Sequence, residues 1–231
     1  MNKVVKFHNL GLIDYKECWD YQEKLFNEIL KLKSENRKFG VKKNTENHLI
    51  FCEHDHVYTL GKSGDQNNLL VSEEYLKLRK AKFYKVNRGG DITYHGPGQI
   101  VGYPILDLEN FFTDINKYLR FLEEAIILTL QDYNIKSDRS IGETGVWIEP
   151  GTTKARKICA IGVKTSRWVS MHGFAFNINC NLDYYNNIIP CGIQNKKVTS
   201  LKQELGLDVS LDKVADKVKA HISNLFEMRM Q

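Results

Sequence analysis

The 231-residue chain lacks several features that mark specialised classes of protein. No apolar stretch approaches the ~18 residues that would suggest a membrane-spanning helix. The N-terminal segment Met1–His8 has neither the apolar core nor the small-residue cleavage site of a secretory signal. Only 4 prolines are present, and no Pro/Gly-rich linker or internal repeat divides the chain. These absences predict a single cytoplasmic domain over residues 1–231, with no membrane association.

The cysteines also lack the spacing of a disulfide framework or a zinc site, because no Cys-x-x-Cys pair occurs. The five are Cys18, Cys52, Cys159, Cys180 and Cys191. An odd, scattered set in a chain without a secretory signal predicts reduced thiols. His54 and His56 flank Asp55, but without further ligand spacing we interpret them as a strand-end cluster. The sequence therefore predicts no metal.

A complete phosphate-binding loop is missing as well. Gly61-Lys62-Ser63 resembles the end of such a loop, but His56 stands where its first glycine is required. A hairpin turn is the simpler interpretation, and we expect no cofactor. The net charge of +5 favours an acidic macromolecular partner without distinguishing nucleic acid from protein. A solubilising surface is the alternative explanation of that charge.

Hydrophobic periodicity predicts an α+β fold, with a mixed sheet and helices packed mainly on one face. Helices are expected after the capping residues Asp14, Ser200 and Ser210, and a further long helix is expected to start near Asp114. Short strands are expected at Val4–Phe7, Leu49–Cys52, Val57–Leu60, Val146–Ile148, Ile158–Val163, Trp168–Met171 and Phe174–Ile178.

Two segments carry residues suited to a binding site. Arg88–Gln99 contains four glycines and a proline, which suits either close approach of backbone to a ligand or a pair of tight turns. Lys157 opens the apolar strand Ile158–Val163, where it is either a solvated strand-end lysine or part of a site. Cys159 and Cys180 lie in or at the end of strands, so we interpret both as structural.

Cys191 stands apart from the other thiols because it lies between Pro190 and Gly192, in a turn. Proline stiffens the approach, and glycine lets the following N–H groups face an incoming carbonyl. A nucleophile requires an exposed sulfur with such donors beside it. Cys191 is therefore the candidate nucleophile.

Taken together, these segments closely resemble the lipoyl(octanoyl) transferases. The resemblance covers most of the chain beyond the first helix, and Arg88–Gln99 is its most specific part. At Asp55-His56 the family often has a proline, so we assign that loop no catalytic role. The resemblance implies the fold of the biotin and lipoate protein ligases and transferases.

The resemblance also implies roles for individual residues. Cys191 matches the acyl-thioester nucleophile, and Lys157 matches the lysine that lowers its pKa, with His95 or His172 assisting proton transfer. The acyl-binding positions correspond to Arg88, Gly89, Gly90, Asp91, Ile92, Thr93, Tyr94, His95, Ala160, Ile161, Gly162, Gly173, Phe174 and Ala175.

The implied reaction moves an octanoyl group from octanoyl-acyl carrier protein to a lysine ε-amine. Its acceptors would be lipoyl domains of 2-oxoacid dehydrogenase E2 subunits and the glycine cleavage H protein, with no nucleic acid involved. Two alternatives remain at this point. One is an ATP-dependent lipoate or biotin ligase on the same fold, and the other is a non-catalytic module that binds acyl carriers.

Overall fold

The computed structural model describes residues 1–189 and 197–231. Its main sheet has nine strands in the order β12-β1-β2-β6-β10-β9-β8-β7, with β11 beside β9. The strands are β1 (Val4–Leu12), β2 (His48–Glu53), β6 (Gln99–Ile105), β7 (Asp138–Ser140), β8 (Glu143–Ile148), β9 (Arg156–Ser166), β10 (Val169–Asn177), β11 (Lys197–Val198) and β12 (Arg229–Met230). Parallel pairs at β1 and antiparallel pairs from β2 to β7 make the sheet mixed, as predicted.

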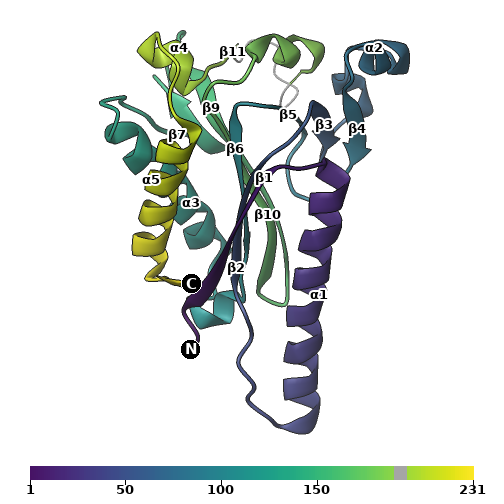
Figure 1. Ribbon diagram of the computed structural model, residues 1–231, viewed down its shortest axis with the longest axis vertical. Helices are drawn as coiled ribbons and strands as arrows, with labels where there is room; N and C mark the ends of the chain where they lie inside the picture. The colour runs from purple at the N-terminus through teal and green to yellow at the C-terminus, as the bar shows by residue number, and fades with distance from the viewer. Residues whose placement is uncertain (190–196) are drawn as a thin grey trace.

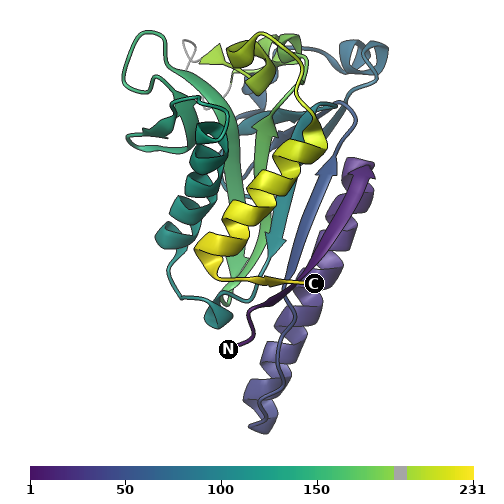
Figure 2. The ribbon, with the colours of Figure 1, turned by 60° about the vertical axis from the view of Figure 1, so that its left-hand side comes forward.

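Three long helices cover the two faces of this sheet (Figures 1 and 2). Helices α3 (Ile115–Gln131) and α5 (Leu211–Phe226) pack on one face, and α1 (Tyr15–Phe39) lies on the other. The larger core lies under α3 and α5, while Leu25, Phe26 and Ile29 of α1 form a second core with β2, β6 and β10. The predicted α+β class is confirmed. We expected the helices to pack mainly on one face of the sheet. Two of the long helices, α3 and α5, do so, and α1 covers the opposite face.

A smaller sheet stands at one end of the main sheet (Figure 1). It consists of β4 (Lys82–Lys85), β3 (Val57–Leu60) and β5 (Ile92–His95), in that order. Short helical segments accompany the two sheets: η1 (Gln66–Asn68), α2 (Glu73–Leu78), η2 (Leu108–Asn110), η3 (Leu182–Asn187) and α4 (Leu201–Leu205).

The predicted helix starts are confirmed by side-chain caps. Asp14, Asp114, Ser200 and Ser210 each accept a hydrogen bond from a backbone N–H in the first turn of the helix that follows. Two predicted strands, however, form one continuous strand in the structure. Trp168–Met171 and Phe174–Ile178 were expected apart, but β10 runs through His172 and Gly173 because both pair with β9.

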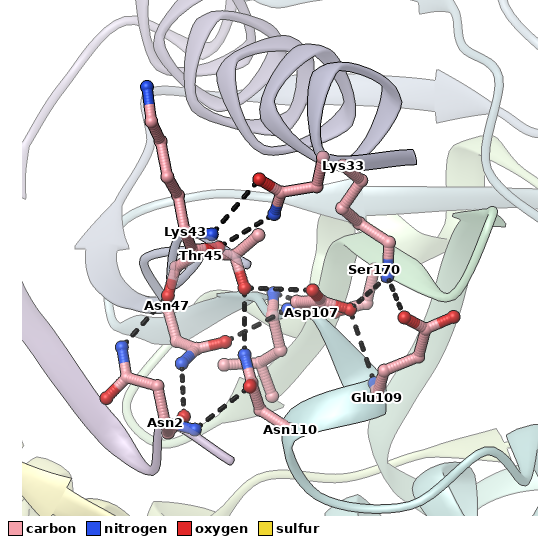
Figure 3. Close-up of polar contacts among 11 residues, drawn as sticks. Asn2, Lys33, Lys43, Thr45, Asn47, Asp107, Glu109, Asn110 and Ser170 are labelled. Atoms are coloured by element: carbon pink, nitrogen blue, oxygen red, sulfur yellow. Dashed lines mark hydrogen bonds and ion pairs between the residues drawn. The ribbon is translucent and has the colours of Figure 1, made fainter. Parts of the chain in front are cut away.

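A buried polar network fixes the far end of α1 (Figure 3). The Asp107 carboxylate forms an ion pair with Lys33 of α1 and accepts a hydrogen bond from Thr45 Oγ1 at 2.8 Å. Its backbone N–H donates to Asn47 Oδ1 at 3.0 Å. This network joins α1, the start of β2 and the end of β6, at the end of the sheet opposite β3–β5.

Within residues 1–189 and 197–231, none of the helices combines the length and apolar composition that a membrane crossing requires.

Candidate active site

A pocket of about 520 Å³ lies where the Arg88–Asp91 loop meets β5, β9 and β10. It brings together the three segments that the resemblance assigns to acyl binding, since every expected acyl-binding residue except Tyr94 lines it. Lys157, His172 and Val198 line it as well. Tyr94 points elsewhere: its hydroxyl lies 2.7 Å from His56 Nδ1, and its ring stacks on Tyr184.

Strand pairing explains why two of these segments meet. In the antiparallel register of β9 and β10, Ala160, Ile161 and Gly162 stand opposite Ala175, Phe174 and Gly173. The two triplets therefore form one continuous patch of the sheet. Gly173 also has no room for a side chain, because an added Cβ would lie 2.0 Å from the backbone oxygen of Gly102 on β6.

The Arg88–Asp91 loop lies directly against that patch. Gly89 N–H donates to Val163 O at 2.9 Å, and a Cβ on Gly162 would lie 2.8 Å from Gly89 O. Gly90 has a φ of +86°, a conformation that residues with side chains rarely adopt. The glycines thus allow the backbone of this loop to lie close to the backbone of β9.

The Arg88 side chain holds the loop from behind. Arg88 is only 8% exposed, and its guanidinium donates to Thr59 O at 2.7 Å, Thr59 Oγ1 at 2.9 Å and Gly89 O at 3.0 Å. The Thr59 hydroxyl accepts a hydrogen bond from Arg88, and because arginine has no acceptor atom, this hydroxyl can donate its own proton only to another group. His95 Nε2 lies 3.4 Å from that hydroxyl, within hydrogen-bond distance.

The buried His95 ring is held neutral. Burial, followed by the charges of His54 and Arg88, holds the pKa of His95 well below its usual range. The ring also stacks on Tyr15 with 5.8 Å between centroids. These contacts suit a residue that orders the pocket wall.

His172 occupies a strained position in the middle of β10. Its φ is +60°, and its backbone N–H donates to Gln22 Oε1 of α1 at 3.2 Å. The ring contacts Asn87 Oδ1 through Nε2 at 2.8 Å. Burial, with the charges of Arg88 and Lys164, lowers the pKa of His172 to about 3. Both histidines that line the pocket are therefore uncharged at neutral pH.

Lys157 begins β9 at the edge of the pocket. Its Nζ lies 3.4 Å from Thr144 O and 4.7 Å from the centroid of the Trp147 ring. Its backbone oxygen accepts from Thr199 N–H at 2.9 Å. The side chain is thus held beside the pocket by β8, rather than extended into solvent as a strand-end lysine would be.

Cys191 lies outside the described residues, which stop at Ile189 and resume at Lys197. The chain on either side of this gap is anchored to the pocket. Ile189 N–H donates to Asn68 O at 2.8 Å, and Ile188 packs with Ile92 and Tyr185, which line the pocket. On the other side, Val198 pairs with Lys157.

Two of the remaining thiols show how an unreactive cysteine is placed in this fold. Cys159 is fully buried, and burial raises its pKa far above its usual range. Burial likewise raises the pKa of Cys180 to about 12. Since the thiolate is the reactive form, neither thiol has the environment of a nucleophile. Both match the structural role expected of them.

Several residues that line the pocket were not expected from the sequence. They are Tyr15, Val101, Tyr103, Leu119, Gly142, Glu143, Thr144, Val163, Asn177, Tyr185 and Val198. Tyr15 begins α1 and belongs to its apolar face, which predicts core packing rather than a site. Only the contact of α1 with the sheet reveals its second role.

Comparison with known proteins identifies the family. The lipoyl protein ligase A/B catalytic domain matches residues 14–223. An octanoyltransferase of Christiangramia forsetii is 62% identical over 100% of this chain and 99% of its own length. The chain belongs to the octanoyltransferase family. It is therefore an acyltransferase, as the resemblance implied.

A second octanoyltransferase, from Flavobacterium psychrophilum, is 62% identical over 98% of both chains. Among solved structures, a bipartite lipoate protein ligase from Thermoplasma acidophilum superposes with a TM-score of 0.71 over 100% of this chain and 86% of its own. At 16% identity this likeness establishes the fold alone. The expected ligase and transferase fold is thereby confirmed.

Proposed function

We propose that this octanoyltransferase moves an octanoyl group from octanoyl-acyl carrier protein, through a thioester on Cys191, to a lysine ε-amine. The acceptors would be lipoyl domains of 2-oxoacid dehydrogenase E2 subunits and the glycine cleavage H protein, in the cytoplasm. One observation carries the proposal: the expected acyl-binding segments and Lys157 line one pocket, and Val198 ties the end of the Cys191 segment to Lys157.

In the first step the Cys191 thiolate attacks the carbonyl carbon of the octanoyl thioester. The new bond joins this carbon to Cys191 Sγ, and the bond to the carrier's sulfur breaks. That sulfur leaves as a thiolate and takes up a proton. The positive charge of Lys157 favours the thiolate of Cys191 over the thiol, which at a pKa of ~8.5 is only a few per cent ionised at neutral pH.

In the second step a neutral lysine amine attacks the carbonyl of acyl-Cys191. A C–N bond forms, the C–S bond breaks, and the amine gives up a proton. His172 is a weak proton acceptor because its pKa is about 3. Lys157 is the better candidate: its ammonium gives a proton to the departing carrier thiolate in the first step, and the neutral amine that remains accepts the proton of the attacking lysine in the second. His95 and His172 then order the pocket as neutral rings.

The pocket suits an alkyl chain. Ile161, Val163 and Phe174 supply apolar surface, and the glycines of the Arg88–Asp91 loop leave room beside them. Each buried methylene contributes ~0.8 kcal/mol, so a pocket of fixed depth discriminates between chain lengths.

A transfer assay separates this proposal from its two alternatives. Octanoyl carrier protein and an apo lipoyl domain should yield octanoylated domain without nucleotide or magnesium, because the thioester supplies the energy. Free octanoate with ATP should yield none. Strict dependence on ATP would indicate a ligase. Binding of the carrier protein without formation of octanoylated domain would indicate a non-catalytic module that binds acyl carriers.

A further inference from the structure

A group of side chains of the kinds that bind metal ions lies behind the wall of the pocket. It consists of Cys18 from α1, Cys52 from β2 and His54 just after β2. The two Sγ atoms are 4.0 Å apart, and Cys52 Sγ lies 3.5 Å from His54 Nε2. All three ligand atoms lie within 4.8 Å of one another, and the residues are between 0% and 4% exposed. His56 is not part of this group, since it contacts Tyr94.

The orientation of His54 leaves the Nε2 lone pair beside Cys52 Sγ and the Tyr103 hydroxyl. Its Nδ1 lies 2.8 Å from Ile13 O, a group that only accepts, so Nδ1 carries the ring proton. Nε2 is then the unprotonated nitrogen. A backbone carbonyl that holds the second ring nitrogen is the usual support of a metal-binding histidine.

The distance between the two sulfurs and that from Cys52 Sγ to His54 Nε2 fit a tetrahedral zinc ion. Bonds of ~2.3 Å to sulfur and ~2.0–2.1 Å to nitrogen place two sulfurs about 3.8 Å apart and sulfur about 3.5 Å from nitrogen. The Tyr103 hydroxyl, 2.9 Å from His54 Nε2, supplies an oxygen at the remaining side. Two thiolates, an imidazole and an oxygen form a ligand set that zinc accepts.

Charge and access favour a metal over a disulfide at this place. Two thiolates balance the charge of Zn²⁺, so the occupied site is neutral overall and avoids an uncompensated charge in the core. In the folded chain Cys18 is 0% exposed and Cys52 is 4% exposed, which slows the reaction of either thiol with an oxidant.

We propose that Cys18, Cys52 and His54 bind one zinc ion, with the Tyr103 hydroxyl as fourth ligand. Binding forms two Zn–S bonds and releases two thiol protons to solvent. The ion joins the first turns of α1 to β2 and β6, next to Tyr15 and Tyr103 of the pocket wall. The site is structural, and it does not depend on the proposed transfer reaction.

The full-length protein tests this site directly. We would unfold it, remove metal with a chelator, and refold it with or without Zn²⁺ before measuring bound zinc by mass spectrometry. One zinc per chain should survive a brief wash with chelator, and the midpoint of thermal unfolding should rise with zinc. Refolding with Co²⁺ should give the sulfur-to-cobalt charge-transfer absorption of thiolate ligation.

Two matched variants locate the ion. The double variant Cys18→Ala and Cys52→Ala should bind no wash-resistant zinc, whereas Cys180→Ala removes an equally buried thiol and should bind it fully. Wild-type protein that retains no zinc after the wash, or shows no thiolate absorption with Co²⁺, overturns the proposal even if the double variant fails to fold. Zinc retained in full by a folded double variant overturns it as well.

Discussion

At the scale of single residues, the position of Lys157 decides which of its two interpretations holds. A solvated lysine at the start of a strand has no fixed partner. Here the ammonium lies over the Trp147 ring and close to Thr144 O, on the rim of the pocket. That placement favours a role in the site, and it can be tested through the thiol that we propose it activates.

Lys157→Ala should raise the pKa of Cys191, because removing a positive charge beside a thiol disfavours the thiolate. Transfer should slow by ~10²–10⁴-fold, the usual contribution of a positioned acid–base group. The measurement is the pH dependence of iodoacetamide alkylation, with Lys154→Ala, an exposed lysine three residues away, as the control. If the pH dependence of alkylation and the rate of transfer are both unchanged in Lys157→Ala, Lys157 is only a solvated lysine at the start of a strand.

Gly162 offers a second test at this scale. In Gly162→Ala the new Cβ would lie 2.8 Å from Gly89 O, so the Arg88–Asp91 loop has to move off β9. We expect a ~1–3 kcal/mol loss of stability and a clear rise in KM for the acyl donor. Gly89→Ala is the matched control, because its nearest contact is an ordinary 3.4 Å. Equal kinetics for the two variants would show that the close approach does not shape the pocket.

At the scale of elements, the sequence identified much of the fold but not how its parts meet. The predicted caps Asp14, Ser200 and Ser210 placed their helices correctly because a cap is a local signal, satisfied within one turn. The segments Ala160–Gly162 and Gly173–Ala175 were assigned to the site by resemblance alone. Their contact arises from the register of β9 and β10, which no local pattern specifies.

The same limit explains the elements that the sequence did not predict. β6 is buried along its whole length and contains Gly102 and Pro104, so it lacks the alternation that marks a half-exposed strand. The proposed zinc site is not apparent in the sequence for a related reason. Cys18 is 34 residues from Cys52, and only the packing of α1 on the sheet brings them together.

The Asp107 network provides a prediction about α1. Asp107→Ala leaves the Lys33 ammonium, whose side chain is 12% exposed, without its buried partner. Breaking a buried pair in this way costs ~3–5 kcal/mol. Glu109→Ala removes a more exposed partner of the same lysine and should cost far less. Chemical denaturation measures the free energy of unfolding of each variant. Equal losses of this free energy in the two variants would show that the buried Asp107–Lys33 pair does not stabilise α1.

At the scale of the whole molecule, buried histidines make stability depend on pH. The folded-state pKa is about 3 for His172 and about 4 for His48, against ~6.5 in an unfolded chain. Below pH ~6.5 the unfolded state binds more protons, so the free energy of unfolding falls as the pH falls. Each such histidine contributes ~1.4 kcal/mol per pH unit until its folded-state pKa is reached.

His172→Asn should therefore reduce the slope of stability against pH between about pH 6.5 and 5. Urea denaturation at a series of pH values measures that slope directly. His221→Asn, which alters a surface histidine beside Asp132, is the control. A slope that His172→Asn leaves unchanged would show that the His172 ring is not held neutral by the fold.

Intact-mass spectrometry shows directly whether Cys191 carries the acyl group. After mixing with octanoyl carrier protein, the wild-type chain and Cys180→Ala should each gain one octanoyl group that hydroxylamine releases. Cys191→Ala should gain none and should transfer nothing to a lipoyl domain. An adduct on Cys159 or Cys180, or normal transfer by Cys191→Ala, would contradict the account.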